Sequence, residues 1–299
     1  MPSIDYPWLY DTVRKRFDSD AALEDFLPKA LSADELRRKG DDRYLSAMSQ
    51  RVFQAGMQHT MVDAKWPAFE EVFKGFPPEA MVAIGPAEID GWLKDARIIR
   101  HRTKLESIPK NARFILDIRA EHGGSFGDFI ADWPVSDIVG LWRVLAQRGS
   151  RLGGRSASGF LRLVGKDTFL ITSHVIARLQ ESGVIECTPT SQRDLQRVQE
   201  AFNALQETSG RPLCQLSALL ALSIHPMFEG GPVGRTSSRQ ADAKPVTLRV
   251  SVPCGSGCPA GWALTAETAA KSGEIGRRIV ALAETAVFCS SFRNRRFLQ

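Results

Sequence analysis

The spacing of apolar residues over the first 230 positions constrains the fold of this chain more than any other feature. Apolar side chains recur every three or four residues, which places them on one face of a helix. Two such sets are Leu45, Met48, Val52, Phe53 and Met57, and Trp66, Phe69, Phe73 and Phe76. We find no alternating strand pattern there, and Gly- or Pro-containing breakers separate the segments. The sequence predicts an all-α domain of about ten helices over residues 1–230.

Two helix starts can be placed from local signals. Ser32 is followed three residues later by Glu35, which is the pattern of a capping box. Ser191 precedes a second apolar periodic segment in the same way, with Asp194 three residues on. We therefore expect helices to begin directly after Ser32 and Ser191.

The composition changes after residue 230. Residues 231–299 are rich in Gly, Ser, Ala, Thr and Arg and show little periodicity. We expect a poorly ordered or loosely attached extension, in which 275–288 is the best helical candidate and 246–252 could form a short strand. Its three cysteines, Cys254, Cys258 and Cys289, come without a histidine and do not complete a tetrahedral zinc site.

The net charge of +5 arises in this extension. Residues 231–299 carry a balance of +6 and residues 1–230 a balance of −1. Overall charge therefore gives no argument that the helical domain binds nucleic acid.

Composition also bounds the class of protein. Hydrophobic residues make up 43% of the chain and charged residues 24%, as in folded soluble proteins. No apolar run is long enough to span a bilayer, and the N-terminus does not resemble a signal peptide. The five cysteines, none before Cys187, do not form a disulfide framework. We expect a cytoplasmic monomer without a membrane segment or a cofactor.

Two windows of the helical domain are locally basic. Residues 138–166 contain no Asp or Glu and hold Arg143, Arg148, Arg151, Arg155, Arg162 and Lys166. Residues 97–113 contain one acid, Glu106, and hold Arg97, Arg100, Arg102, Lys104, Lys110 and Arg113. Each window is either a contact for the DNA backbone or a solvated helix face.

The first window contains a glycine-rich turn between two helical segments. Glycines permit a tight turn, and the free N–H groups of a helix starting near Arg155 would face a phosphate. This is the physics of a helix-hairpin-helix element, which grips DNA without reading its sequence. The predicted contacts in the turn are Arg148, Arg151, Gly153, Gly154, Arg155 and Ser156, with Arg100, Arg102 and Lys104 from the second window. The alternative is an interhelical loop with solvent-facing arginines.

Several ordered motifs resemble one known family. They are Val52-Phe53-Gln54-Ala55-Gly56-Met57, the stretch from Asp95 to Leu105, and Asn111-Ala112-Arg113. From about residue 41 to residue 184 the chain resembles the bacterial DNA-3-methyladenine glycosylase I family. That resemblance implies the all-α helix-hairpin-helix glycosylase fold. It also implies hydrolysis of the N-glycosidic bond of 3-methyladenine, or a related alkylated base, in double-stranded DNA during base-excision repair.

The resemblance also implies a base pocket formed by Arg51, Phe53, Gln54, His59 and Trp66. Arg51 stands where the family commonly has a glutamate, and His59 where it has a tryptophan. An arginine repels a cationic base and suits a neutral lesion or a phosphate. Phe53 and Trp66 suit a hydrophobic core equally well. The family's structural zinc uses an N-terminal cysteine that is missing here, so we expect no metal.

The sequence does not identify the catalytic group. Related glycosylases often carry an aspartate where this chain has Thr172. Asp167 and His174 are the candidates nearby. Asp167 could instead cap a helix starting at Thr168, and His174 could simply be packed. No lysine occupies the position used by glycosylase/lyases, which predicts a monofunctional enzyme. The alternative function is a helix-hairpin-helix protein that binds DNA without catalysis.

Overall fold

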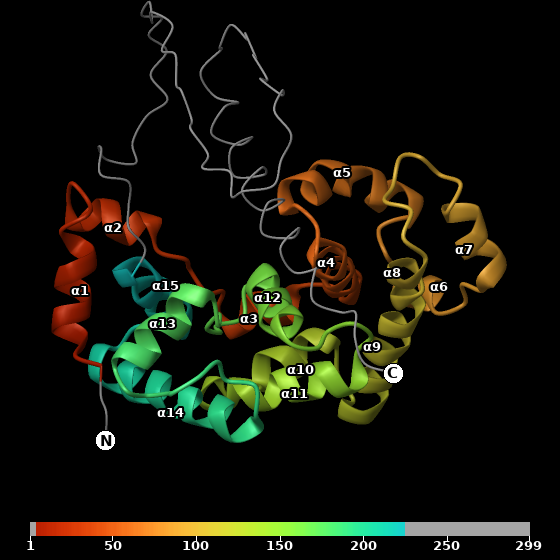
Figure 1. Cartoon of the computed structure of the whole chain (residues 1–299). Coiled ribbons are helices and arrows are strands. Elements are labelled where there is room, and N and C mark those ends of the chain that lie inside the picture. Colours follow the sequence, from red (N-terminus) through yellow and green to blue (C-terminus); the bar gives the residue numbers. More distant parts are fainter. Residues whose placement is uncertain (1–3, 225–299) are drawn as a thin grey trace, which may run out of the picture. The chain divides into compact units, whose positions relative to one another are not determined.

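The computed structural model describes residues 4–224 of the 299-residue chain, and over that range it is all-helical (Figure 1). The predicted fold class is confirmed, with fifteen α-helices and one 3₁₀ turn in the described range rather than about ten helices. The excess consists of short elements such as α6 and α8, each of four residues. The elements are α1 (Tyr6–Arg14), α2 (Asp20–Phe26), α3 (Ala33–Arg38), α4 (Asp41–Gln54), α5 (His59–Val72), α6 (Pro78–Met81), α7 (Pro86–Trp92), α8 (Arg102–Leu105), α9 (Ser107–His122), α10 (Phe126–Asp132), η1 (Val135–Asp137), α11 (Ile138–Arg148), α12 (Arg155–Val164), α13 (Ser173–Glu181), α14 (Gln192–Ser209) and α15 (Leu213–Ile224).

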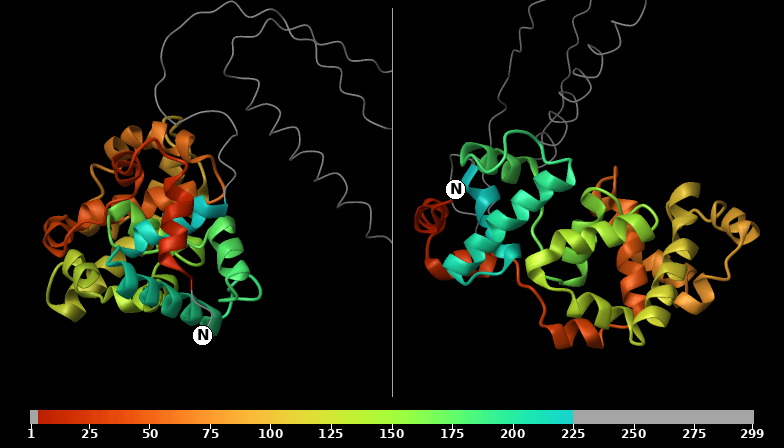
Figure 2. Two further views of the ribbon diagram at one scale, coloured as in Figure 1. Left: turned by 90° about the vertical axis from the view of Figure 1, so that its left-hand side faces the viewer. Right: turned by 90° about the horizontal axis from the view of Figure 1, so that it is seen from below.

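Helices from the two ends of the described range lie together. Helix α1 packs against α14 and α15, and α13 packs against α15. On the other side, α5 and α9 contact α4 (Figures 1 and 2). Helices α4 and α12 contact each other between these two groups. Several residues predicted to meet DNA and base, among them Arg51, Arg155 and Ser156, come from the contacting helices α4 and α12.

An aromatic cluster fills the core beside α4 and α5. The Trp66 ring stacks on Phe69 at 4.7 Å and on Phe76 at 5.7 Å between ring centroids. Phe53 meets Phe69 edge-on at 4.8 Å. The Trp66 indole N–H donates to the Ser46 hydroxyl at 3.1 Å, which satisfies its one polar atom. The helical spacing of these residues thus marks core packing.

Both predicted helix starts are confirmed. The Ser32 hydroxyl accepts from the Glu35 backbone N–H at 3.3 Å, and the Glu35 carboxylate accepts from the Ser32 N–H at 2.8 Å. The Ser191 hydroxyl accepts from the Asp194 N–H at 3.1 Å at the start of α14. These signals are reliable because donor and acceptor lie three residues apart in the chain.

Other helix ends are satisfied by side chains from distant segments. The Lys104 ammonium donates to the Phe53 and Ala55 carbonyls at 3.0 and 2.6 Å, at the end of α4. Lys166 donates to two carbonyls at the end of α10, at 3.2 and 2.6 Å. A cation at a helix C-terminus also meets the negative end of the helix dipole. Both ammoniums therefore act inside the fold.

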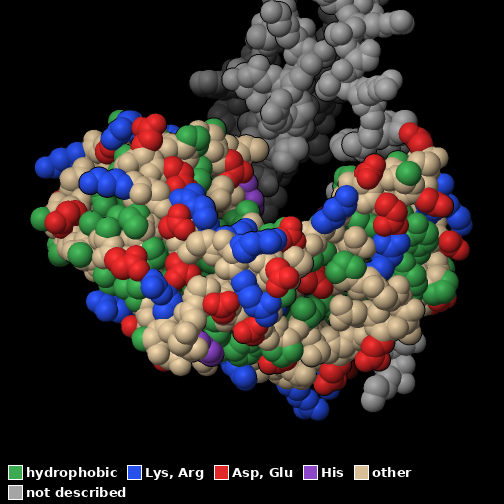
Figure 3. Space-filling model, turned by 180° about the vertical axis from the view of Figure 1, so that it is seen from behind, with side chains coloured by type: hydrophobic (Ala, Val, Ile, Leu, Met, Phe, Trp, Pro, Cys, Tyr) green, Lys and Arg blue, Asp and Glu red, His purple; other side chains and the backbone are tan. Residues whose placement is uncertain are grey.

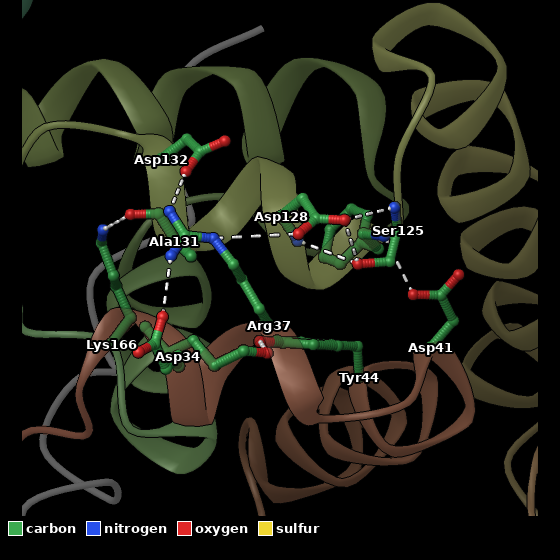
Figure 4. A network of polar contacts seen from close by, with 11 residues as sticks. Asp34, Arg37, Asp41, Tyr44, Ser125, Asp128, Ala131, Asp132 and Lys166 are labelled. Atoms are coloured by element: carbon green, nitrogen blue, oxygen red, sulfur yellow. Dashed lines mark hydrogen bonds and ion pairs between the residues drawn. The ribbon is translucent and has the colours of Figure 1, made fainter.

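Helix α3 is fastened to α10 by a polar network (Figure 4). Arg37 donates to Asp34 at 3.1 Å and to Asp132 at 2.5 Å, and its guanidinium lies 3.8 Å from Asp128. Asp41 accepts the first N–H of α10, from Phe126, at 2.9 Å. The network ties the start of α4 to α10 and helps to orient α4.

The chain divides between Val233 and Gly234, and the unit before that division contains all the described residues. The predictions for the extension, including the helix at 275–288, the strand at 246–252 and the Cys254, Cys258 and Cys289 group, lie outside the described residues. The domain boundary at residue 230 stays a prediction. Between residues 4 and 224 no helix is long and apolar enough to cross a membrane.

Candidate nucleic-acid interface

The hairpin turn joins α11 to α12. Helix α11 ends at Arg148 and α12 begins at Arg155, which confirms the predicted helix start. Gly154 has φ 57° and ψ −129°, a conformation that glycine alone adopts readily. The chain can therefore enter α12 from this turn only because residue 154 has no side chain.

Two distant residues hold the turn in place. Asn111 is fully buried on α9, and its amide oxygen accepts from the Ser150 N–H at 2.7 Å while its NH₂ donates to the Ser150 carbonyl at 3.2 Å. Arg151 donates to the Thr103 hydroxyl at 2.9 Å and to its carbonyl at 3.2 Å. Sequence reasoning missed Asn111 as a functional residue. Its signal was an amide within the apolar run of α9, which must find a buried partner.

The predicted phosphate contacts in the turn separate into two groups. Arg148 is engaged elsewhere, because it makes two hydrogen bonds of 2.6 Å to Glu121 and lies over the Phe114 ring. Ser156 is buried, and its N–H donates to the Gly153 carbonyl at 3.1 Å. Both groups stabilise the hairpin itself in this structure, and their contact with DNA stays a prediction.

The remaining members of the turn face outward. Arg151, Gly153, Gly154 and Arg155 are exposed. The Arg155 Nε donates to the Ile171 carbonyl at 3.1 Å, which fixes the direction of its side chain. No carboxylate in the described range forms an ion pair with Arg151 or Arg155. The turn therefore presents two cations and exposed backbone together, as a phosphate site requires.

Half of the six cations in the second basic window are paired or buried. Arg102 pairs with Asp90 and lies 4.0 Å from Glu106. Lys104 is 6% exposed and holds the end of α4, so it is corrected as a DNA contact. Burial, together with the charge of Arg151, lowers the pKa of Lys104 below its ordinary value. Arg100 is exposed and is the member of the predicted set in this window that stays available for a phosphate.

Arg51 reaches from the end of α4 to the start of α12. One of its terminal nitrogens donates to the Arg155 carbonyl at 3.3 Å, and the other lies 3.5 Å from the His59 Nε2. The Arg51 Nε is buried without a hydrogen-bond partner. Burial and the positive charge of Arg155 lower the pKa of Arg51. The structure thus brings together two predicted pocket residues, Arg51 and His59, with the hairpin.

The guanidinium of Arg51 rests on Gly159 of α12. A side-chain carbon added at Gly159 would lie 2.8 Å from the Arg51 Cζ. Arg51 therefore occupies the space that a side chain at residue 159 would take, where α4 contacts α12.

Gln54 finds its partner within the protein. It is 5% exposed, and its NH₂ donates to an Asp63 carboxylate oxygen at 2.8 Å. Gln50 donates to the same oxygen at 2.9 Å. A base edge is therefore not needed to satisfy this amide. Asp63, an exposed carboxylate held by two amides at the end of α4, is a residue that sequence reasoning missed.

Phe53 and Trp66 are core residues rather than pocket-lining ones. Their exposed fractions are 0% and 8%, and both belong to the aromatic cluster described above. Their place in the predicted base pocket is therefore corrected. The reason is that helical spacing identifies the buried face of α4 and α5 but not an open cavity beside it.

Comparison with known proteins identifies one segment of the chain. Residues 36–147 match the methyladenine glycosylase family. The chain is 36% identical over 77 residues to the DNA-3-methyladenine glycosylase of Haemophilus influenzae and 34% identical over 77 residues to the DNA-3-methyladenine glycosylase 1 of Escherichia coli. Each alignment covers 26% of this chain and 41% of the relative.

Solved structures show a more distant likeness. The 3-methyladenine DNA glycosylase I from Staphylococcus aureus is 21% identical with a TM-score of 0.39, covering 52% of this chain and 85% of the other. The Methanocaldococcus jannaschii 8-oxoguanine DNA glycosylase is 17% identical with a TM-score of 0.48, covering 72% and 92%.

The segment that matches the family model contains both clamps of the hairpin. Thr103 and Asn111 lie within residues 36–147, and so do Arg51, Gln54 and His59. The turn that these clamps hold follows directly after the segment. Side chains of the matched segment therefore hold in place a turn that lies just outside it.

The catalytic candidates, Asp167 and His174, follow α12 in the chain. Both carboxylate oxygens of Asp167 accept N–H groups at the start of α15, from Leu213 at 3.0 Å and Cys214 at 2.8 Å. The predicted helix at Thr168 does not form. Helix α13 begins at Ser173, with the Thr172 hydroxyl as its cap. Thr172, which stands where related enzymes carry an aspartate, thus caps a helix.

His174 lies half-buried on the first turn of α13. Over residues 4–224, no group of three or more His, Cys, Asp or Glu side chains comes close enough to hold a metal ion.

Proposed function

We propose that this chain is a DNA glycosylase that releases 3-methyladenine or a related alkylated base from double-stranded DNA in base-excision repair. The observation that carries the proposal is the Asn111 clamp. A residue of the segment that matches the family model, fully buried, is used to fix an exposed basic turn. Fixing the turn with a buried amide is expected if the turn has to bind a ligand in one defined position.

DNA would be held by its backbone. The exposed guanidiniums of Arg151 and Arg155 would contact phosphates of one strand, and the start of α12, which has no side-chain cap, offers N–H groups to the same strand. Such contacts carry no base readout, so affinity would depend on salt more than on sequence.

The chemistry asks little of the protein. A methylated purine is positively charged, and this charge weakens its glycosidic bond. As the oxygen of water bonds to the sugar C1′, the bond to the base nitrogen breaks, and its electron pair leaves with the base and neutralises it. The water releases one proton. The protein has to extrude the nucleotide, at a cost of a few kcal/mol, and to position the water.

The base would lie at the end of α4. We assign Arg51, Gln54 and His59 to this site and add Asp63, whose carboxylate can balance a cationic base. Arg51 opposes such a base by charge repulsion and would have to turn toward a phosphate when the base enters.

We also propose that the enzyme has no lyase activity and acts as a cytoplasmic monomer. A lyase needs a free amine to attack the sugar. The Lys104 and Lys166 ammoniums near the hairpin helices are buried and donate to backbone carbonyls. Neither can reach DNA without giving up these bonds.

A second candidate function is DNA binding without catalysis. It is favoured by Arg51, which fills the space over Gly159, and by Thr172, which replaces a carboxylate. Both observations argue against base release only, and neither argues against DNA binding by the hairpin.

One experiment separates the two functions. The full chain is incubated with methylated duplex DNA, and released bases are identified by chromatography, with the same DNA incubated without protein as the blank. We expect free 3-methyladenine above the blank and abasic sites that stay uncleaved until alkali is added. Binding of duplex without base release would favour the second function, and the absence of both would reject the two together.

A further inference from the structure

A cavity of about 520 Å³ opens beside the hairpin and is separate from the Arg51 site. Its walls come from α11, the first turns of α12 and α13, and residues 188–195. Gly154 and Arg155 of the hairpin lie at its edge, whereas Arg51, Gln54 and His59 are not among its lining residues. Its volume is within the range of about 300 to 1,000 Å³ usual for sites that take a small molecule.

One side of the cavity is apolar and rigid. Trp142 lies in its wall with Ile171 and Ile176. The Trp142 indole N–H donates to the Thr168 hydroxyl at 3.1 Å, and its ring meets the Phe169 ring edge-on at 4.7 Å. The ring is therefore held in one orientation, and with 7% of the residue exposed it contributes a small, fixed apolar area to the wall.

The polar part of the lining is cationic. It contains two arginines, Arg143 and Arg155, and neither Asp nor Glu. Both arginines are exposed, and over residues 4–224 neither forms an ion pair. Hydroxyls of Ser158 and Ser173 complete the lining on this side. The cavity is thus complementary to a ligand with a planar apolar body and an anionic group.

We propose that this cavity binds one nucleotide of the DNA strand that the hairpin grips, with the base near Trp142 and the phosphate on Arg143 and Arg155. The proposal rests on the proposed function in taking DNA as the ligand. The shared residue Arg155 supports DNA as the source of the nucleotide, because Arg155 belongs both to the exposed turn and to the cavity edge. The site would hold a nucleotide unstacked next to the reacting one, apart from the base at the end of α4.

Two pairs of variants test the cavity. Ala146 lines it on the exposed side of α11, so Ala146→Trp fills it, and Gln147→Trp places the same ring on a neighbouring exposed position outside the lining. Arg143→Gln removes one cation, and Arg113→Gln removes an exposed arginine of α9 as its match. Far-ultraviolet circular dichroism and melting curves establish that each variant is folded.

Calorimetry with adenosine 5′-monophosphate, adenosine and inorganic phosphate gives the ligand class. We expect the monophosphate to bind best, and Ala146→Trp to weaken it by at least about tenfold through overlap of volumes. Arg143→Gln should weaken it by about tenfold through loss of a charged hydrogen bond, with both matched variants unchanged. No binding of the monophosphate, equal binding to Ala146→Trp, or phosphate binding as tightly as the monophosphate would overturn the proposal.

Competition with DNA decides the source of the nucleotide. We expect the monophosphate to displace an unmodified duplex from the full chain, and Ala146→Trp to bind that duplex more weakly than Gln147→Trp. A monophosphate that binds without displacing DNA would overturn the assignment to the DNA strand. Base release is measured in parallel. If Ala146→Trp releases bases and binds the duplex as the unchanged chain does, the cavity proposal is rejected and the proposed enzyme function stands. If binding depends on the cavity but no base is released, the cavity proposal stands and the proposed enzyme function is rejected.

Discussion

The two basic windows are alike in sequence, and in the fold their unpaired cations lie on different elements. Residues 97–113 and 138–166 each hold six Lys or Arg side chains. In the first window, Arg97 pairs with Asp95 and Glu71, Arg102 pairs with Asp90, and Lys104 is buried. The acids that neutralise these arginines come mostly from outside the window. The other three cations, Arg100, Lys110 and Arg113, are exposed without an ion pair in the described range.

In the second window the cations divide between interior and surface. Arg162 is largely buried and donates to the Thr168 and Cys214 carbonyls, and Arg148 pairs with Glu121. Arg143, Arg151 and Arg155 remain exposed without a carboxylate partner in the described range. Figure 3 shows the same mixing of acidic and basic side chains over one face of the described unit. The number of basic residues in a sequence window therefore indicates the electrostatic potential at the surface only once their ion-pair partners in the fold are known.

Charge reversal in the hairpin should give the largest effect on DNA binding. Changing Arg151→Glu together with Arg155→Glu should weaken duplex binding about 100-fold and lower the salt slope by about 2, because two phosphate contacts are lost. The matched pair Arg97→Glu and Arg102→Glu should change affinity only a few-fold. Titrations at several salt concentrations measure both quantities. Equal losses in the two pairs would mean that the windows do not differ in function.

Among the variants proposed, removal of the Lys104 ammonium should lower the free energy of unfolding most. Lys104→Met leaves the Phe53 and Ala55 carbonyls without a donor, and we expect the free energy of unfolding to fall by about 2 to 3 kcal/mol. Arg102→Met, on the surface of the same short helix, should cost less than about 1 kcal/mol. Urea denaturation of the two variants checks this difference, and similar values would show that Lys104 is not structural.

Loss of the Asn111 clamp should affect both stability and binding. Asn111→Ala removes two hydrogen bonds to Ser150, and we expect about 1 to 2 kcal/mol less stability with duplex affinity reduced about tenfold. Asn111→Asp keeps the acceptor for the Ser150 N–H but buries a carboxylate oxygen against the Ser150 carbonyl, and it should be at least as unstable as Asn111→Ala. A destabilised Asn111→Ala protein with full DNA affinity would separate the clamp from the interface.

The smallest effect is expected at Asp167. Asp167→Asn keeps one acceptor for the start of α15, and we expect a loss of about 0.5 to 1 kcal/mol with base release unchanged. The single-turnover rate of base release is the measurement. A rate that falls strongly while stability does not would return Asp167 to the catalytic candidates.

The fold could be predicted from sequence because its signals are local. The periodic spacing of residues such as Phe69 and Phe73, and the caps at Ser32 and Ser191, depend on positions a few residues apart. The start of α12 at Arg155 followed from glycines in its own turn.

The site could be predicted only in part, because its partners are remote in sequence. Arg148 meets Glu121, Asp167 meets α15, and Lys104 meets the end of α4, over separations that no spacing rule covers. Asn111 and Asp63 were missed for the same reason. Each is defined by a partner in another helix.

The contact of Arg51 with Gly159 couples two positions that are remote in sequence. An alanine at 159 would push the flexible end of Arg51 outward, whereas a shorter side chain at 51 would leave room for that methyl group. The absent side chain of Gly159 thus sets where the Arg51 charge lies, and a change at 159 would move that charge without altering Arg51 itself.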